Sequence, residues 1–274
     1  GSAGIVTHAT CGVGPVRGMH EMEEVLYAVS GNYLYTVSEG GTATQIGGQI
    51  SGNDIVSMDD NGTELSITNG TNGYIYSADA GFRLVSSVNF HAANTTTFHD
   101  GFFVHDRVGT NEVFISDEYD GTTYSDFFQE AYSKSDNVIA VYNHLQLLHV
   151  FGKETIEFWV NQGAPDFPFR RQPGAIAARG LASPHAFAVE DSAVFILGND
   201  RIPYRLNGTT PEKISTAGID RLWQDSNPIS DVSSFAYTFA GHKFIVYNLP
   251  GRNETWVWDI STGLWHERGS HDMH

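Results

Sequence analysis

The chain has 274 residues, with 15 Lys and Arg against 32 Asp and Glu, a formal net charge of −17 and one cysteine, Cys11. This charge argues against an outer surface that grips a polyphosphate backbone, because such proteins need Lys and Arg to displace counterions. The single cysteine excludes an intramolecular disulfide framework. No run of about 18 apolar residues occurs, so we predict no transmembrane helix and no membrane partner.

A strand–turn–strand couplet recurs six times along the chain. Each copy has an alternating or apolar strand, a turn with Gly or Asn, and a second alternating strand, which is the signature of a β-hairpin. The couplets span residues 25–41, 64–81, 101–117, 145–160, 192–206 and 242–259. Successive copies lie 39 to 54 residues apart, measured between the anchors Tyr35, Tyr76, Ile115, Phe158, Tyr204 and Trp258. A repeat of about 40–50 residues built from hairpins is typical of propeller blades with four strands.

Further strands flank the couplets. They are predicted before the hairpins at 54–58, 137–143, 185–191 and 233–239, and after them at 82–86, 212–215 and 264–268. A lone four-stranded sheet cannot bury both of its faces, whereas neighbouring blades cover each other. We therefore predict an all-β fold, a β-propeller of six four-stranded blades in a single domain over residues 1–274. A β-sandwich is the alternative, and seven blades are possible if the chain is truncated.

Two segments fall outside this repeat. Residues 1–2, Gly-Ser, are interpreted as a tag remnant. Residues 125–137 are predicted to form a short helix on the rim, with Ser125 or Asp126 as its N-cap.

Five Asn-x-Thr sequences occur, at Asn61, Asn69, Asn94, Asn207 and Asn253. In a secreted protein they are candidate glycan acceptors. Three of them read Asn-Gly-Thr, and Asn-Gly is the preferred pair for a tight hairpin turn. We therefore interpret them as turns.

Acidic clusters are the candidates for chemistry. They lie at 57–64, 116–126 and 190–192. Paired carboxylates serve glycoside hydrolysis, and Asp117, Glu118 and Asp120 offer the oxygen ligands that Ca²⁺ takes. An Asp-Gly turn is nevertheless ordinary hairpin chemistry. We predict no enzymatic activity, no catalytic or metal-binding residue and no cofactor, with Ca²⁺ at this acidic loop as the alternative.

Histidines and tryptophans indicate no site of their own. The 12 histidines show no spacing typical of metal ligands, and His105 and His149 are expected to lie within strands. The tryptophans are expected to fill the packing between blades, which favours large flat side chains. A sugar-stacking platform is the alternative for them. The five are Trp159, Trp223, Trp256, Trp258 and Trp265.

The segment 153–181 holds three arginines in an otherwise acidic chain. Its "ETIEFWV" run is predicted to be the third strand of the fourth blade, and 163–169 the loop that leaves it, because prolines there bar a regular strand. Arg170, Arg171 and Arg179 are then expected on the connection between blades four and five. We interpret them as a candidate interface that pairs with carboxylates across a blade or subunit boundary; solvent exposure without a partner is the alternative.

Four pieces, taken in order, resemble the packaged-DNA stabilisation protein (tail hub, or nozzle) family of short-tailed bacteriophages. They are "GIVTHATCGVGPVRGM" (4–19), the stretch 127–159 with its "FGKETIEFW" end, the residues Gly163, Pro168 and Phe169 with the following "GAIAARGLASPHA" (174–186), and "HKFIVYNLPGRNETWVWDISTGLW" (242–265). The resemblance covers nearly the whole chain, and the part from 133 to 187 is the more specific. Family members continue beyond the last residue of this chain, which is therefore expected to be a fragment of a longer tail protein.

The resemblance implies a structural role in the virion. Copies of the chain would form a homo-oligomeric ring below the portal protein, extend the channel through which DNA leaves and stabilise the packaged DNA. Other tail proteins would attach to this ring, which would assemble in the cytoplasm of the bacterial host. An acidic inner wall would let DNA pass without sequence-specific binding. The alternatives are a carbohydrate-binding or glycoside-cleaving propeller and a generic protein-interaction propeller.

Overall fold

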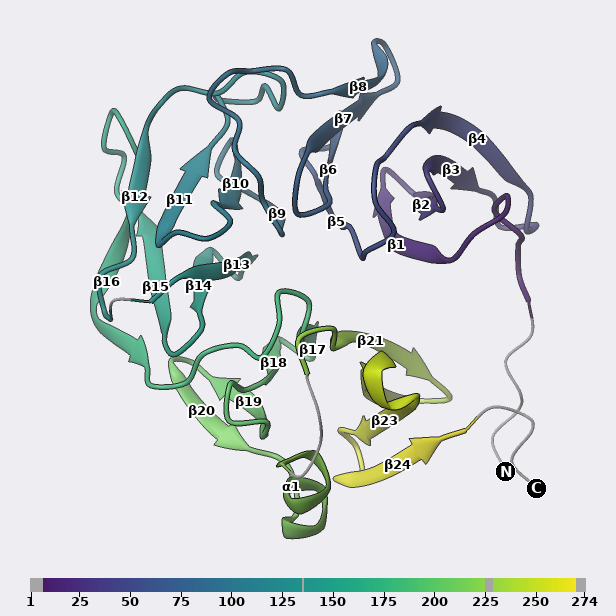
Figure 1. The fold of residues 1–274 in the computed structure, drawn as a ribbon, viewed down its shortest axis with the longest axis vertical. Helices are drawn as coiled ribbons and strands as arrows, with labels where there is room; N and C mark the ends of the chain where they lie inside the picture. The colour runs from purple at the N-terminus through teal and green to yellow at the C-terminus, as the bar shows by residue number, and fades with distance from the viewer. Residues whose placement is uncertain (1–6, 135, 225–228, 270–274) are drawn as a thin grey trace. The chain divides into compact units, whose positions relative to one another are not determined.

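The computed structural model describes residues 7–134, 136–224 and 229–269. Within these residues, 24 strands form six four-stranded antiparallel sheets, accompanied by one α-helix and one short 3-10 helix (Figure 1). Each sheet takes four strands that are consecutive in the sequence. The predicted all-β fold of six four-stranded blades is confirmed. No helix among the described residues is long and apolar enough to cross a membrane.

The chain divides into two compact units. The first comprises residues 1–108 and 113–128, and the second comprises 109–112 and 129–274. Blades one and two belong to the first unit, blades four to six belong to the second, and the boundary runs through blade three. That the chain is a single domain stays a prediction.

The first three blades contain β1 to β12. Blade one has β1 (Val16–Met22), β2 (Val25–Ser30), β3 (Tyr33–Val37) and β4 (Ala43–Gly48). Blade two has β5 (Ser57–Asp60), β6 (Glu64–Thr68), β7 (Gly73–Ser77) and β8 (Gly81–Leu84). Blade three has β9 (Thr96–His99), β10 (Phe102–Asp106), β11 (Glu112–Ile115) and β12 (Phe128–Glu130).

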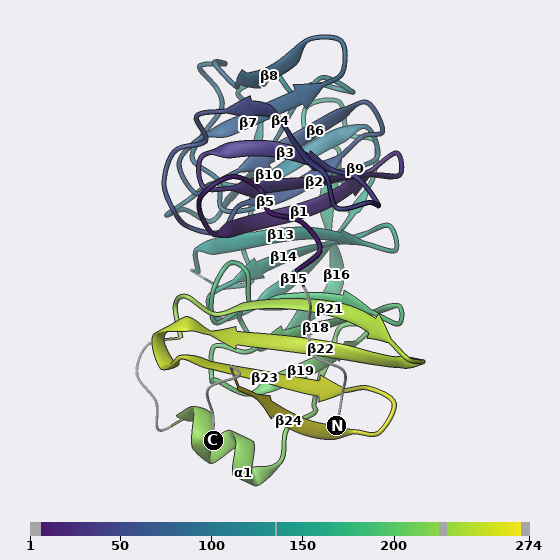
Figure 2. The same cartoon turned by 90° about the vertical axis from the view of Figure 1, so that its right-hand side faces the viewer.

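The last three blades contain β13 to β24. Blade four has β13 (Val138–His144), β14 (Leu147–Gly152), β15 (Ile156–Asn161) and β16 (Phe169–Ala177). Blade five has β17 (Phe187–Glu190), β18 (Ala193–Leu197), β19 (Pro203–Asn207) and β20 (Thr210–Lys213). Blade six has β21 (Ser233–Phe239), β22 (His242–Leu249), β23 (Glu254–Asp259) and β24 (Leu264–Arg268), seen as one sheet in Figure 2. The 3-10 helix Pro250–Arg252 joins β22 to β23.

The second and third strands of each blade hold the core. Most of their side chains are buried, and in β18 all five residues are buried. In the second unit, Phe195 of blade five and Trp258 of blade six place their rings 5.6 Å apart. Trp159 and Trp223 are fully buried, and Trp258 is 8% exposed. The expected packing of tryptophan between blades is therefore confirmed for this pair, and these three side chains are not free to form a sugar platform.

The helix predicted at 125–137 is wrong. The described residues of this segment contain the strand β12 instead, and their backbone N–H groups donate to distant parts of the chain. Ala131 N donates to the carbonyl of Asn111, and Tyr132 N and Ser133 N donate to the carboxylate of Glu157. A backbone tied outward in this way cannot make the i to i−4 bonds of a helix.

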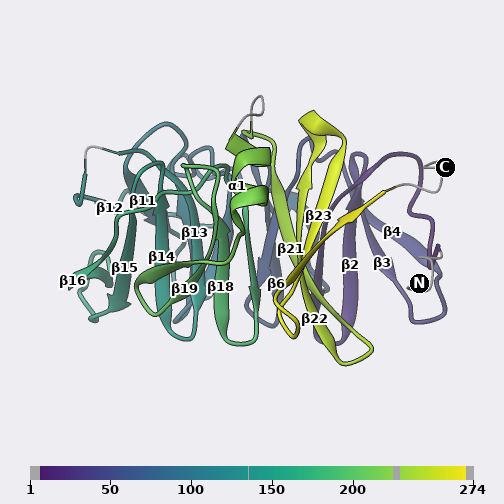
Figure 3. The ribbon, with the colours of Figure 1, turned by 90° about the horizontal axis from the view of Figure 1, so that it is seen from below.

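The observed helix, α1 (Ala217–Gln224), was not predicted. It has only eight residues, about two turns, and a glycine near its start, which is too short a stretch for apolar periodicity to predict a helix. Figure 3 shows α1 beside the strands of blade six. Its buried residues are Ile219 and Trp223, and the Trp223 ring lies 5.5 Å from that of Tyr247 in β22 and 5.4 Å from that of Trp265 in β24. Packing against blade six therefore determines this helix.

The Asn-Gly-Thr sequences form turns, as interpreted. Asn61 accepts hydrogen bonds from Thr63 N at 3.0 Å and Glu64 N at 2.7 Å through its side-chain oxygen, and Gly62 has a φ of +87°. Asn69 repeats this arrangement one strand later, in the turn between β6 and β7. A side-chain oxygen that replaces a backbone acceptor, followed by a left-handed glycine, is the chemistry that selects these residues for tight turns.

Several hairpins between the first and second strands use residues poorly suited to their turn. Glu23 and Glu24 have φ values of 50° and 61° between β1 and β2, and Leu145 and Gln146 have 50° and 63° between β13 and β14. Two consecutive positive φ values are those of a type I′ turn, for which Asn-Gly is preferred. Residues with a Cβ pay about 1–2 kcal/mol each in this conformation.

The double substitution Glu23→Asn with Glu24→Gly is therefore expected to raise the free energy of unfolding by about 1 kcal/mol. Urea denaturation followed by circular dichroism measures the change. Glu23→Gln with Glu24→Gln is the matched control, because it removes both charges without relieving the backbone. An equal gain in the control would assign the effect to charge repulsion rather than to the turn.

Candidate functional site

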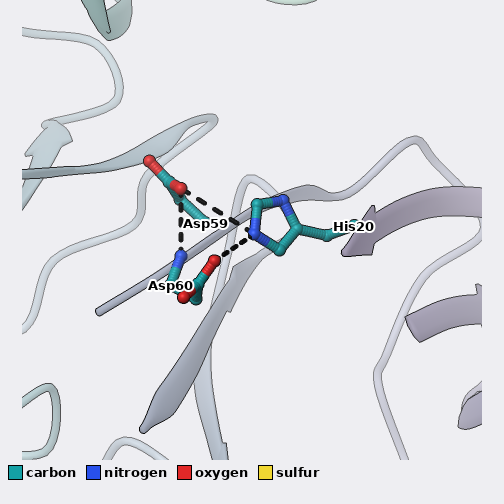
Figure 4. Close-up of side chains that lie close together, drawn as sticks. All are labelled: His20, Asp59 and Asp60. Atoms are coloured by element: carbon teal, nitrogen blue, oxygen red, sulfur yellow. Dashed lines mark hydrogen bonds and ion pairs between the residues drawn. The ribbon is translucent and has the colours of Figure 1, made fainter. Parts of the chain in front are cut away.

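His20, Asp59 and Asp60 form a compact cluster in the first unit (Figure 4). His20 Nε2 lies 2.6 Å from Asp60 Oδ2 and 3.9 Å from Asp59 Oδ1. The side chains of His20, Asp59 and Asp60 are 22%, 25% and 20% exposed, so all three are mostly buried but still in contact with solvent. The imidazole nitrogen thus faces one oxygen of each carboxylate.

Two blades supply this cluster. His20 lies in β1, the first strand of blade one, and the two aspartates end β5, the first strand of blade two. Strands β1 and β5 lie side by side, as do β5 and β9 (Figure 1). The three side chains therefore join neighbouring blades within the first unit.

Hydrogen bonds outside the cluster orient both carboxylates. Asp59 Oδ2 accepts from Phe98 N at 2.7 Å and from Thr97 Oγ1 at 3.0 Å, and its Oδ1 accepts from Asp60 N at 3.0 Å. Asp60 Oδ1 accepts from Gly62 N at 2.7 Å. Burial raises the pKa of Asp59, and the hydrogen bond from Phe98 N and the charge of His20 oppose that rise. Backbone N–H groups thus hold both oxygens of Asp59 and one oxygen of Asp60, and the second oxygen of Asp60 contacts His20.

Sequence reasoning named the acidic segment 57–64 but did not connect it with His20. The spacing that links them is the blade repeat itself, because His20 and Asp60 are 40 residues apart. Strands at the same place in consecutive blades lie next to each other, so residues one repeat apart can meet. A search for polar residues separated by one blade repeat, about 40 residues, would have identified His20 and Asp60 as a candidate pair.

Arg170 and Arg171 lie within β16, the fourth strand of blade four, and not on the connection after it. That part of the prediction is wrong. The prolines do interrupt the chain over 162–168, where Gln162 N donates to the carbonyl of Pro168 and closes the loop. The chain then pairs with β15 again, placing Arg171 opposite Trp159 and Arg170 opposite Val160, and a register shift accommodates the later residues of the strand.

The three arginines make different contacts. Arg170 Nη1 donates to the carbonyls of Phe167 at 2.6 Å and Phe169 at 3.0 Å, which ties the loop to its own strand. Arg171 is exposed and donates to Ser133 Oγ at 3.1 Å. Neither has a carboxylate within ion-pair distance in the described part of the chain.

Arg179 does lie on the connection between blades four and five, and it pairs with a carboxylate. Its Nε lies 3.0 Å from Asp200 Oδ2 and 3.1 Å from the hydroxyl of Tyr204, and its guanidinium lies 5.7 Å from the centre of that ring. Tyr204 also donates to Asp200 at 2.7 Å. The hydrogen bond with Tyr204 raises the pKa of Arg179. This triad links blade five to the chain that enters it; a subunit interface at the three arginines stays a prediction.

The acidic loop proposed for Ca²⁺ is a hydrogen-bonded turn. Asp117 and Asp120 face each other in an isolated bridge. The carboxylate of Asp120 accepts from Thr122 N at 2.8 Å, Thr122 Oγ1 at 2.6 Å and Thr123 Oγ1 at 2.8 Å. Both of its oxygens are thus engaged, and Ca²⁺ binding at this loop stays a prediction.

The first strands of the blades carry more acidic than basic residues. Among the described residues of these six strands the carboxylates are Glu21, Asp59, Asp60 and Glu190. Arg17 is the one Lys or Arg in the same strands, and its guanidinium donates to backbone carbonyls. Lys243 lies 3.3 Å from Glu190. The excess of negative charge fits the expected acidic wall, although a channel-lining position stays a prediction.

His105 and His149 are strand residues, as expected, and are 0% and 3% exposed. His149 Nδ1 donates to the carbonyl of Leu147 at 2.9 Å, and the ring packs against Phe151 and Phe158. Burial lowers the pKa of His105 to about 3 and that of His149 to about 4. These two histidines are therefore neutral members of the core.

Acid is expected to destabilise the protein through these histidines. A depressed pKa means that the unfolded chain binds more protons, so the stability contributed by His149 is present above pH 6.5 and is lost as the pH falls towards 4. The free energy of unfolding is therefore expected to fall between pH 6.5 and pH 4.5, and in His149→Phe this decrease is expected to be smaller by about 2 kcal/mol. Urea denaturation at both pH values measures the difference.

Asp106 opposes this effect, because burial raises its pKa to about 6 and its protonation stabilises the folded state as the pH falls through 6. Because Asp106 is present in both wild type and His149→Phe, its contribution cancels when the two proteins are compared. His266→Phe, at an exposed position in β24, is the control. If the free energy of unfolding of His149→Phe and His266→Phe fell equally between pH 6.5 and pH 4.5, the role given to His149 would be contradicted.

The sequence was compared with protein families and with curated proteins. It matches the family described as bacteriophage P22 Gp10, β-propeller, over residues 1–267. No curated protein matches the sequence.

Solved structures of other propellers share the fold at low identity. PorZ, a surface component of the type-IX secretion system of Porphyromonas gingivalis, is 12% identical with a TM-score of 0.55, and the match covers 96% of this chain and 34% of PorZ. Hsv2 of Kluyveromyces lactis is 9% identical with a TM-score of 0.51, covering 93% of this chain and 84% of Hsv2. At such identities these structures support the fold alone, whereas the family match spans nearly every residue. The chain belongs to the bacteriophage P22 Gp10 β-propeller family.

Proposed function

We propose that this chain is the propeller of a phage tail hub, which extends the portal channel and retains packaged DNA in the head. The observation that carries the proposal is the family match over residues 1–267, in a chain that folds as six four-stranded blades. The role is mechanical, without enzymatic activity. Its site of action is the neck or tail of the virion, after assembly in the host cytoplasm.

Charge supports the passage of DNA. The net charge is −17, and the first strands hold four carboxylates against one buried arginine. A negative surface repels DNA phosphates and gives no counterion release on contact. DNA would then pass the protein without sequence-specific binding.

The expected partners are the portal protein, other tail proteins and further copies of the same chain in a ring. Arg171 is the arginine that we propose for such a contact, because it is exposed on the fourth strand of its blade and has no carboxylate partner among the described residues. Arg170 and Arg179 are engaged within the chain.

Portal binding tests this function. The protein is incubated with portal rings of the parent phage, and complexes are detected by sedimentation and negative-stain imaging. Added density on one end of the portal ring is expected, weakened in Arg171→Glu and retained in Arg221→Glu, a charge-matched change on the exposed face of α1. Absence of binding by the wild type at every salt concentration would refute the proposal, and hydrolysis of host-surface polysaccharide would refute the non-enzymatic role.

A further inference from the structure

We propose that His20, Asp59 and Asp60 bind a divalent metal ion of the Zn²⁺ class, which joins the first and second blades. The three donor atoms are the imidazole Nε2 and one oxygen from each carboxylate, and they all lie within 4.8 Å of one another. A nitrogen donor with two carboxylates suits Zn²⁺, whereas Ca²⁺ and Mg²⁺ take oxygen ligands.

The distances require little rearrangement. Ligands about 2.0–2.1 Å from a tetrahedral Zn²⁺ lie about 3.3 Å apart. The two contacts of His20 Nε2, at 2.6 Å and 3.9 Å, bracket this value. The shorter contact is a hydrogen bond, so one proton on Nε2 would leave as the metal enters. Partial exposure of all three side chains leaves room for water as the fourth ligand.

The carboxylates are already oriented for binding. Phe98 N and Thr97 Oγ1 fix Asp59 Oδ2, and Gly62 N fixes Asp60 Oδ1. Hydrogen bonds to the non-ligating oxygens are what determines the direction of carboxylate ligands in metal sites. Thr97 and Phe98 lie in β9, a strand that supplies no ligand, whereas Gly62 lies in the turn after β5 and Asp60 N itself donates to Asp59 Oδ1.

The local charge also favours a cation. Among the described residues, no Lys or Arg lies within 4 Å of either carboxylate, and His20 is their one basic neighbour. Two largely buried carboxylates thus share at most one positive charge. Burying negative charge without a cation is unfavourable, and a divalent ion would neutralise both groups.

Zinc titration of the full chain tests the site. The sequence also ends in "HDMH", outside the described residues, so all measurements are made in a His271→Ala, His274→Ala background. Binding of ZnCl₂ by isothermal titration and the zinc-dependent rise in Tm are measured for each variant. Asp60→Asn and Glu21→Gln are a matched pair, because each removes one negative charge from neighbouring first strands, and Glu21 is exposed outside the cluster. His20→Gln is the second test variant.

One zinc ion per chain and a higher Tm with zinc are expected for the background protein and for Glu21→Gln. Asp60→Asn and His20→Gln are expected to raise the Kd by about tenfold or more and to lose the Tm shift. Because each variant is compared with and without zinc, a lower basal stability does not obscure the result. Equal zinc affinity in Asp60→Asn and Glu21→Gln, or no Tm shift in the background protein, would overturn the proposal. A larger shift with CaCl₂ than with ZnCl₂ would overturn the assignment of the ion.

Discussion

Replacing Arg17 by leucine is expected to lower the free energy of unfolding by about 3–5 kcal/mol. This guanidinium is 4% exposed and donates to four carbonyl oxygens, of Asp54 at 2.6 Å, Gly31 at 2.9 Å, Ser51 at 2.9 Å and Ile50 at 3.1 Å. Arg17 thus ties blade one to the connection that leads into blade two. Leucine would leave these buried acceptors without their donor, which is the costly form of a lost hydrogen bond.

Urea denaturation followed by circular dichroism measures this loss. Tryptophan fluorescence does not report on it directly, because all five tryptophans lie in the second unit. Arg17→Lys is the informative control. Lysine keeps the charge but lacks the planar guanidinium that reaches four acceptors. Arg17→Lys is therefore expected to recover less than half of the unfolding free energy that Arg17→Leu loses. A leucine variant within about 1 kcal/mol of wild type would show that the four contacts contribute little.

Glu157→Ala is expected to cost about 2–4 kcal/mol. The carboxylate is 2% exposed and accepts from Tyr132 N at 2.8 Å, Ser133 N at 2.5 Å and Trp159 Nε1 at 2.7 Å. It fixes the segment that enters blade four and holds the largest side chain of that blade. Alanine would leave three donors unpaired and a cavity beside the indole.

Tryptophan fluorescence during urea denaturation follows this change, because Trp159 is itself a partner. Glu154→Ala is the matched control: Glu154 is half exposed and pairs with Lys134 at the surface, where an ion pair contributes about 1 kcal/mol or less. Glu157→Gln is expected to fall between wild type and Glu157→Ala, since an amide accepts from the two backbone groups but presents N–H to the indole if so oriented. Equal effects of Glu154→Ala and Glu157→Ala would contradict the anchoring role.

The blade repeat could be predicted because hairpins carry their own signals. Alternating side chains and turn residues gave all six couplets, and the predicted strands 233–239 and 264–268 coincide with β21 and β24. The polar first strand of blade three did not stand out, because Thr96, Thr97 and His99 are buried without being apolar. Strand β16 was missed because Pro168 and Pro173 disguised it. The register shift in its pairing with β15 is how the strand tolerates the second proline.

The candidate site could not be predicted because it depends on contacts between repeats. The sequence shows that His20 and Asp60 are one blade apart, but only the pairing of β1 with its own blade and its position beside β5 bring them to 2.6 Å. The same holds for Arg17, whose carbonyl partners lie as far as 37 residues along the chain. The periodicity within a strand cannot predict contacts between strands of different blades. The turn at Asn61 could be predicted, because its hydrogen bonds join residues two and three positions apart.

Retention of DNA in the phage head tests the central claim most directly. The gene for this protein is deleted from the parent phage, and nuclease-protected DNA is measured in purified heads, with the gene supplied in trans as the control. A tail hub that closes the head is expected to be required, so deleted particles would package DNA and then lose it, and complementation would restore protection. Heads that keep a full complement of protected DNA without this protein would contradict the proposed function.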